Sequence, residues 1–241
     1  MRTKMVTSTG VRGRLEVIEK RIAGACQRVG RKVDEVTLIG VSKTFPPPVV
    51  AEGIEAGLRV LGENRVQEAA TKMSELAAVS AAHSVAWHLI GHLQSNKVRR
   101  AVELFAMIHS VDSLKLAERI DAICGETGRR MPILVEVNLG GEESKSGVSP
   151  HEAPGICDGI TRLSNVELCG LMTVPPIATE ATGARPYFIR LRELRDEIRH
   201  LGLVGPSFAH LSMGMSQDFE VAIEEGATLI RIGTAIFGTR E

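Results

Sequence analysis

The stretch "VTLIGVSKTFPPP", from Val36 to Pro48, gives the first indication of the fold. Its apolar, largely β-branched run up to Val41 is typical of a strand that is buried on both faces, as in parallel sheets. The run ends at Ser42 and Lys43, and the three prolines that follow cannot continue a strand. A lysine, which is costly to desolvate, therefore lies where a buried strand ends.

Strand-like and helix-like segments alternate along the rest of the chain. After the strand at 36–41, further strands are predicted over 58–64, 86–92, 106–112, 132–140, 166–174, 208–214 and 228–238. An extra helix is predicted over 15–30, before the first strand. Eight apolar strands that alternate with helices predict an α/β fold, a (β/α)8 TIM barrel. The alternative is an open doubly wound sheet, although no G-x-G-x-x-G motif follows the first strand.

Length and composition agree with a barrel. The chain has 241 residues, and 44% of them are hydrophobic but only 3% aromatic, so that aliphatic side chains must fill the core. A barrel interior layered with Val, Ile and Leu meets this requirement. No composition break or long linker divides the chain, and residues 1–241 are therefore predicted to form one domain.

Charge and cysteine content exclude several classes of protein. Lys plus Arg and Asp plus Glu both number 29, so there is no net basic field to attract nucleic acid. The four cysteines show no C-x-x-C spacing, which favours reduced packing residues. Residues 1–10 lack the apolar core of a signal peptide, and no apolar run is long enough to span a membrane. The sequence predicts a cytoplasmic protein with no membrane or nucleic-acid partner.

Lys43 is the first candidate functional residue, because barrels of this kind place their sites at the C-terminal ends of the strands. Desolvation favours the neutral amine of a lysine, and a neutral amine can attack an aldehyde to form a Schiff base. The alternative is a lysine whose ammonium reaches solvent at the rim of the barrel.

The segment "HLSMGMSQDFEVAIEEGATLIRIGTAIFG", from His210 to Gly238, provides a second indication. Ser212 lies near the end of the seventh strand, and Gly233 and Thr234 follow the core of the eighth. The loops after these two strands form the usual phosphate site of such barrels, in which glycine allows close approach of the backbone. The alternative is two ordinary strand-to-helix turns.

Arg231 lies between these loops, inside the apolar stretch "LIRIG". An arginine that points into a barrel stays charged and needs a partner. A ring nitrogen held as an acceptor would serve, and so would a carboxylate such as Glu136 in an ion pair of the barrel core. An amine, a phosphate site and a donor for a ring nitrogen together suit pyridoxal phosphate.

Seven motifs carry a resemblance to a known family: "VSKTFP", "GENRVQEA", "WHLIGHLQSNKVR", "HSVDS", "VNLGGEESKSGV", "GLMTVPP" and "LSMGMSQDFEVAIEEGATLIRIGTAIFG". They closely resemble the pyridoxal phosphate homeostasis proteins, which are relatives of the N-terminal barrel of alanine racemase. The resemblance covers the chain from about Val36 to Gly238.

The resemblance implies pyridoxal phosphate as cofactor and assigns its contacts to six residues: Lys43 for the imine, Ser212, Gly233 and Thr234 for the phosphate, Arg231 for the pyridine nitrogen, and Asn64 close to the cofactor. Arginine leaves the ring nitrogen unprotonated, which weakens the electron sink that carbanion chemistry needs. Lys145, in "GGEESKSGV", is hypothesised to assist cofactor exchange; the alternative is a solvent-exposed loop lysine.

The resemblance favours a carrier over an enzyme. Alanine racemases add a β-rich domain that supplies a catalytic tyrosine, whereas this sequence stops at Glu241 and its only tyrosine, Tyr187, falls in a predicted helix. Racemisation needs groups on both faces of the cofactor, and no second base is evident. The expected function is storage and delivery of pyridoxal phosphate by a monomer, with apoenzymes as recipients. The alternatives are a racemase or another pyridoxal phosphate enzyme of the same fold type and, less in keeping with a lysine on the first strand, a Schiff-base aldolase.

His88 and His92 do not suggest a metal site. On a strand that rises by about 3.3 Å per residue, side chains four residues apart are separated by more than about 12 Å. His88 is therefore predicted to be a core histidine with a hydrogen-bond partner.

Overall fold

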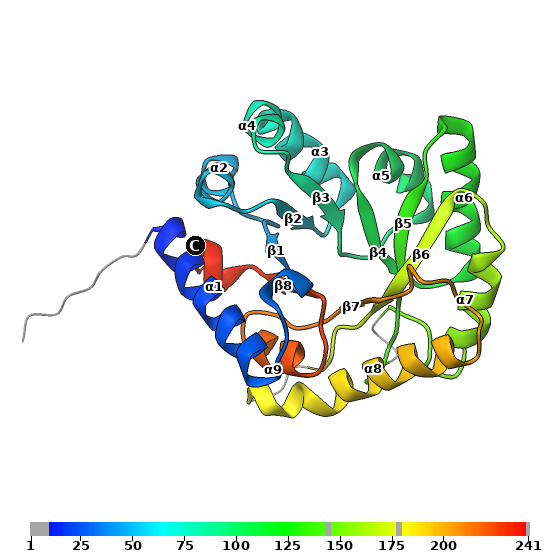
Figure 1. Ribbon diagram of the computed structural model, residues 1–241. Coiled ribbons are helices and arrows are strands. Elements are labelled where there is room, and N and C mark those ends of the chain that lie inside the picture. Colours follow the sequence, from blue (N-terminus) through cyan, green and yellow to red (C-terminus); the bar gives the residue numbers. More distant parts are fainter. Residues whose placement is uncertain (1–9, 143–145, 177–179, 240–241) are drawn as a thin grey trace, which may run out of the picture.

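Eight parallel strands form a closed barrel in the computed structural model, each strand pairing with the next along the chain and the last with the first (Figure 1). The structure describes residues 10–142, 146–176 and 180–239. The strands are β1 (Thr37–Val41), β2 (Val60–Glu63), β3 (Ala86–Leu89), β4 (Met107–Val111), β5 (Met131–Glu136), β6 (Val166–Met172), β7 (His210–Ser212) and β8 (Leu229–Ile232). The (β/α)8 barrel predicted from the sequence is confirmed.

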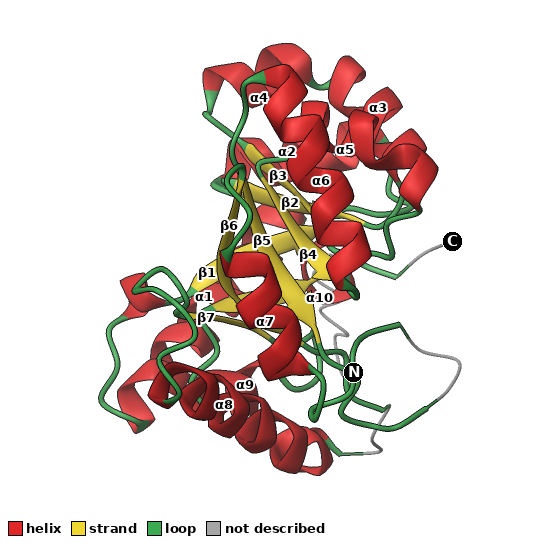
Figure 2. Ribbon diagram, turned by 90° about the vertical axis from the view of Figure 1, so that its right-hand side faces the viewer, coloured by secondary structure: helices red, strands yellow, loops and turns green. Residues whose placement is uncertain are grey.

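Helices surround the barrel (Figure 2). They are α1 (Val11–Arg28), α2 (Pro47–Ala56), α3 (Val66–Glu75), α4 (Ala77–Ala82), α5 (Val98–Leu104), α6 (Leu114–Thr127), α7 (Ala153–Thr161), α8 (Arg185–His200), α9 (Phe219–Glu224) and α10 (Thr234–Phe237), with 3-10 turns η1 (Val33–Glu35), η2 (Ser95–Lys97) and η3 (Ala181–Ala184). Most of the apolar core lies between strands and helices, because each short strand buries its outer face against them.

The eighth predicted strand is too long. Its apolar run continues through "GTAIFG", but β8 ends at Ile232. The N–H groups of Ile236 and Phe237 both donate to the carbonyl of Gly233, each at 2.9 Å, so the chain turns into α10 there. Apolar residues alone do not distinguish a buried strand from a buried helical turn.

The extra N-terminal helix is confirmed as α1, which packs against α2, α9 and α10. Its buried residues Val11, Leu15, Ile18 and Ile22 recur with the period of a helix. Arg14 donates from Nε to the carbonyl of Ile236 at 2.6 Å, which ties this helix to the end of the barrel.

The interior of the barrel is only partly aliphatic. A small apolar cluster made of strand residues contains Ile39, Leu134, Cys169, Met172 and Leu229. Six polar side chains are buried on the strands as well: Glu63, His88, His109, Ser110, Ser212 and Arg231. Hydrogen bonds link four of them, His88, His109, Ser212 and Arg231, into one chain. The expectation of an interior layered with Val, Ile and Leu was therefore wrong in this part of the core, because the strands also direct a chain of polar groups inward.

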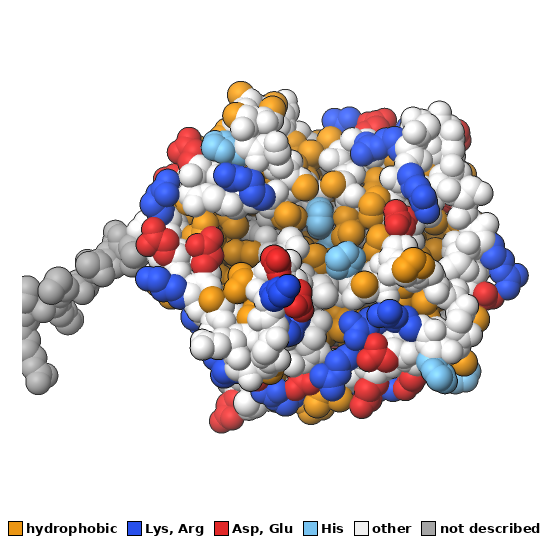
Figure 3. Space-filling model, viewed as in Figure 1, with side chains coloured by type: hydrophobic (Ala, Val, Ile, Leu, Met, Phe, Trp, Pro, Cys, Tyr) orange, Lys and Arg blue, Asp and Glu red, His pale blue; other side chains and the backbone are white. Residues whose placement is uncertain are grey.

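The surface carries mixed charge. Acidic and basic side chains are interspersed on the face shown in Figure 3, in agreement with the equal numbers of the two signs in the sequence. All four cysteines are buried and free, as expected for reduced packing residues. Within the described part of the chain, no helix combines the length and apolarity that a membrane span requires.

Candidate functional site

A cavity of about 400 Å³ lies at the C-terminal ends of the strands, where barrels of this type place their sites. Its size is that of a pocket for a small organic ligand. Residues of β1 and β8 and of the segments that follow β1, β2, β3, β6, β7 and β8 provide the lining: Val41, Lys43, Asn64, Ile90, Val174, Pro176, Glu180, Ala181, Met215, Ser216, Gln217, Asp218, Arg231, Gly233 and Thr234.

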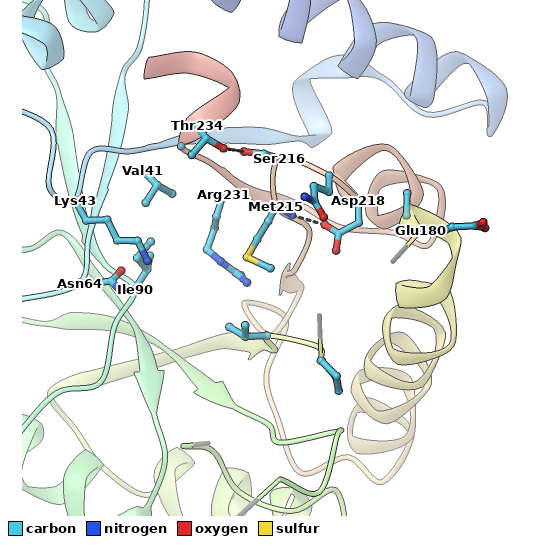
Figure 4. Close-up of a pocket in the computed structure, with 15 residues that line it drawn as sticks. Val41, Lys43, Asn64, Ile90, Glu180, Met215, Ser216, Asp218, Arg231 and Thr234 are labelled. Carbon is cyan, nitrogen blue, oxygen red and sulfur yellow. Dashed lines mark hydrogen bonds between the residues drawn. The ribbon is translucent and has the colours of Figure 1, made fainter. Parts of the chain in front are cut away.

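Lys43 lies in a tight turn directly after β1. The N–H of Phe45 donates to the carbonyl of Ser42 at 3.1 Å and closes the turn. Thr44, at the third position, has a φ of +67°, which a β-branched residue rarely adopts. The side chain of Lys43 enters the cavity from the turn after β1, and that of Arg231 enters the same cavity from β8 (Figure 4).

Arg231 is almost completely buried, with 4% of its surface exposed. It donates from Nη1 to the hydroxyl of Ser212 at 2.6 Å and from Nη2 to the carbonyl of Thr173 at 2.8 Å. Burial lowers the pKa of Arg231 to about 10, although the charges of Glu136 and Asp218 oppose the shift. The guanidinium therefore stays charged at neutral pH, and Glu136 acts on it through its charge and not through a hydrogen bond.

Ser212 belongs to a chain of buried polar groups behind the cavity. Its hydroxyl lies 2.9 Å from Nδ1 of His109, and Nε2 of His109 lies 3.0 Å from Nδ1 of His88. Burial lowers the pKa of His88 to about 4 and that of His109 well below its ordinary value, so both rings are neutral. The prediction that His88 is a core histidine with a partner is confirmed.

Two hydroxyl groups face each other at the end of the cavity formed by the loops after β7 and β8. Thr234 Oγ1 lies 3.3 Å from Ser216 Oγ, which also lies 3.5 Å from the backbone nitrogen of Ala235 (Figure 4). Among the residues that the structure describes, no protein group accepts from the N–H of Ser216 or of Thr234. Hydroxyls and unpartnered N–H groups around one point are the donors that a phosphate requires.

The loop after β7 is fixed by its own contacts. Asp218 accepts a hydrogen bond from the N–H of Met215 at 2.6 Å, and burial raises the pKa of this carboxyl. Gly214 has a φ of +91°, and a Cβ there would lie 2.5 Å from the Cβ of Ala222. A side chain at this position would force the loop away from α9, and with it Ser216.

A smaller cavity of about 180 Å³ adjoins the first and shares Val174 with it. Burial raises the pKa of Glu136, which lines it, to about 7. His92 uses the same Nδ1 atom, at 3.3 Å, toward both Asp112 and Ser146. A serine protease-like triad uses the two different nitrogens of its histidine, so these three residues do not form one.

The predicted site residues fall into three groups. Five of them line the larger cavity together: Lys43, Asn64, Arg231, Gly233 and Thr234. Ser212 is buried behind the cavity and contacts Arg231, while Lys145 lies outside the described residues. Ser216 and Asp218 were missed, although "GMSQD" after the seventh strand contains both. Tyr187 lies on α8 and does not line the cavity.

Comparison with known proteins identifies the relatives of this chain. The family model "Alanine racemase, N-terminal domain" matches residues 18–241. A pyridoxal phosphate homeostasis protein of Aquifex aeolicus is 46% identical, over 95% of this chain and 97% of its own. This chain belongs to the pyridoxal phosphate homeostasis protein family. Another member of the family, from Pseudomonas aeruginosa, is 43% identical over 93% of both chains.

Solved structures of related proteins support the same assignment. PipY of Synechococcus elongatus PCC7942, in a structure with PLP bound, is 39% identical and has a TM-score of 0.80, over 92% of this chain and all of its own. Alanine racemase of Clostridium difficile 630, in its complex with cycloserine, is 16% identical with a TM-score of 0.66, over 92% of this chain and 59% of the racemase. At this level of identity the second likeness shows the fold alone.

Proposed function

We propose that this family member binds pyridoxal 5'-phosphate in the larger cavity and serves the homeostasis of that cofactor by storing and delivering it. One observation carries the proposal: Lys43, Arg231 and the Ser216–Thr234 pair face one cavity of suitable size. When bound, the cofactor would supply an aldehyde and a phosphate. The names of the relatives and the PLP in PipY favour the same ligand.

Each group of the cofactor has a matching protein group. The amine of Lys43 would hold the cofactor through the carbon of its aldehyde, with the aldehyde oxygen lost as water. Ser216, Thr234 and their N–H groups bind the phosphate, with Gly233 admitting it close to the backbone. Arg231, already charged and anchored by Ser212, donates toward the ring nitrogen. Asn64, in the wall beside Lys43, limits the space around the ring.

A carrier is a better match to these residues than a racemase. A donor that stays charged at neutral pH keeps a ring nitrogen unprotonated, and an unprotonated ring is a weak electron sink. An aldolase remains a distinct alternative, because it also needs a lysine and a phosphate site, but its substrate is a sugar phosphate. We further propose that the carrier is a single-domain monomer of the cytoplasm and that apoenzymes receive its cofactor.

The test is an absorption spectrum of the purified protein with added pyridoxal phosphate, before and after borohydride reduction, followed by peptide mapping. We expect a yellow band that disappears on reduction and a pyridoxyl group on Lys43. Lys43→Ala should lose both, whereas Lys115→Ala, which removes an exposed lysine on α6, should keep both. Release of the bound cofactor to an apoenzyme, without turnover of alanine, would then distinguish a carrier from a racemase.

A protein that takes up no pyridoxal phosphate would contradict the proposal. Formation of a borohydride-trapped adduct with a sugar phosphate would instead favour the aldolase. Racemisation of alanine at a rate typical of enzymes, at least about 1 per second, would contradict the carrier function while leaving the cofactor site in place.

A further inference from the structure

Three ionisable side chains form a largely buried cluster next to the turn that carries Lys43. Glu63 is the last residue of β2, and Glu68 and Lys72 lie on α3. Glu63 is completely buried and Lys72 has 4% of its surface exposed, so this pair lies in the protein interior, whereas Glu68 is partly exposed at its edge. Isolated buried charges are costly, which means that these groups must satisfy one another.

Lys72 donates to three acceptors from one ammonium group. These are the carbonyl of Ser42 at 2.6 Å, Oε1 of Glu63 at 2.6 Å and Oε1 of Glu68 at 3.2 Å. An ammonium has three protons, and this geometry uses each of them. The first acceptor is a backbone group, so the cluster does more than pair its own charges.

The two glutamates extend the cluster to the rest of the turn. Oε1 of Glu63 accepts the hydroxyl proton of Ser42 at 2.7 Å, and Oε1 of Glu68 accepts from the N–H of Thr44. The other oxygen of Glu63 has no hydrogen-bond partner within the described part of the chain. Burial raises the pKa of Glu63, opposed by the hydrogen bonds from Lys72 and Ser42. One oxygen of a buried carboxylate thus stays unpaired among the described residues, while the other oxygen and the two remaining side chains bind the turn.

Together these contacts hold the peptide groups on both sides of Lys43. The carbonyl of Ser42 belongs to the peptide group before Lys43, and the N–H of Thr44 belongs to the one after it. Because peptide groups are planar, fixing both of them sets the φ and ψ of Lys43 and therefore the direction of its side chain. The same contacts keep Thr44 at a φ of +67°, a conformation that persists only where the surroundings impose it.

We propose that Glu63, Glu68 and Lys72 are positioning residues that fix the backbone of Lys43 and thereby direct its amine into the cavity. The expected effect on the bond between Lys43 and the cofactor rests on the proposed function; the effect on the backbone of Lys43 does not. The alternative is an ion-pair cluster that only attaches α3 to the barrel. That alternative does not require contacts to Ser42 and Thr44, and it predicts no selective effect on Lys43.

The first test measures amide hydrogen exchange in the protein without cofactor. In Glu68→Ala, the N–H of Thr44 loses its acceptor and should exchange at least about tenfold faster, the effect of one hydrogen bond to a charged group. Glu68→Gln retains an acceptor oxygen and should restore the slow exchange. The control is Glu220→Ala, since this glutamate also pairs with a basic side chain and has an exposure of 31% against 30% for Glu68.

The second test measures the reactivity of the Lys43 amine. We expect the borohydride-trapped incorporation of pyridoxal phosphate at Lys43 to slow by about tenfold in Glu68→Ala but not in Glu220→Ala. Lys72→Met with Glu63→Gln, a variant that removes both fully buried charges and leaves only the partly exposed Glu68, should give the same decrease. Thermal unfolding checks that each variant is folded.

Two results would overturn the positioning role. One is unchanged Thr44 exchange in folded Glu68→Ala; the other is an equal loss of incorporation in Glu220→Ala. If the unsubstituted protein incorporates no pyridoxal phosphate at all, the proposed function fails, and the exchange of Thr44 alone decides whether this backbone is held.

Discussion

Nη1 of Arg231 lies 2.6 Å from the hydroxyl of Ser212, and this bond begins a chain of polar groups that leads away from the cavity into the barrel. An arginine can only donate, so Ser212 accepts from it and has its own proton left for Nδ1 of His109. His109 in turn can donate from Nε2 to Nδ1 of His88. One direction of donation therefore satisfies every link, and it requires both rings to be neutral.

Replacing His109 by leucine should destabilise the fold and weaken cofactor binding. The hydroxyl of Ser212 would lose its acceptor in a fully buried position, which costs about 1–3 kcal/mol. Arg231 would then be held less firmly, and the affinity for pyridoxal phosphate should fall. Urea unfolding and a cofactor titration measure the two effects. His200→Leu, at the exposed end of α8, should change neither; a His109→Leu protein as stable as the original would contradict the chain.

The same histidines predict how stability depends on pH. The pKa of His88 is about 4 in the folded protein against 6.5 in an unfolded chain, so the unfolded state binds more protons in this interval. Stability from this residue is present above pH 6.5 and is lost as the pH falls toward 4, by about 3 kcal/mol. Glu136 has the opposite effect, because its raised pKa of about 7 makes the folded state bind more protons between pH 7 and 4.5.

These two effects offset each other in the unsubstituted protein and can be separated by substitution. Glu136→Gln removes the residue that adds stability as the pH falls. The free energy of unfolding of this variant should therefore fall more steeply between pH 7 and about 4.5 than that of the unsubstituted protein. His88→Gln should show a flatter dependence than the original. Urea unfolding at several pH values, without cofactor, measures both slopes. Parallel curves for all three proteins would show that neither group has a shifted pKa.

Gly170 lies where the addition of a single methyl group should strongly destabilise the fold. It pairs with His210 across β6 and β7, has a φ of +152°, and a Cβ there would lie 2.0 Å from the carbonyl oxygen of His210. The paired backbones of β6 and β7 cannot move apart, so Gly170→Ala should lower the free energy of unfolding by about 4 kcal/mol or more. Gly155→Ala is the control, because the space around this glycine of α7 is open and alanine favours a helix. Soluble yield and urea unfolding compare the two, and similar stabilities would contradict the argument.

The order of the elements was accessible from the sequence because each strand is short, apolar and followed by polar residues. The position of Lys43 at the end of such a strand followed from the same pattern. The polar chain through His109 was not accessible, because the side chains that point into a closed barrel depend on its register. The β5–β6 pairing shifts register between Ile133 and Leu134, and composition does not indicate such a shift.

The two serines of the seventh strand and its loop show the same limit. Ser212 and Ser216 are four residues apart in "LSMGMS", and either could face a phosphate. The difference arises from the turn at Gly214, whose φ of +91° redirects the chain between them. As a result Ser212 contacts Arg231 in the barrel, and Ser216 contacts Thr234 at the cavity.

The different roles of Ser212 and Ser216 can be tested by comparing the binding of pyridoxal phosphate with that of pyridoxal, which lacks the phosphate. Ser216→Ala should weaken binding of pyridoxal phosphate by about tenfold and leave that of pyridoxal unchanged, because it removes one hydrogen bond to a charged group. Ser212→Ala should weaken both ligands alike and lower the free energy of unfolding, because it leaves the Nη1 donor of Arg231 and the Nδ1 acceptor of His109 without a partner in the interior. Spectroscopic titration of both ligands against both variants gives the four affinities. If Ser212→Ala, and not Ser216→Ala, reduces the preference for the phosphorylated ligand, then the phosphate contact belongs to Ser212, as the family resemblance first suggested.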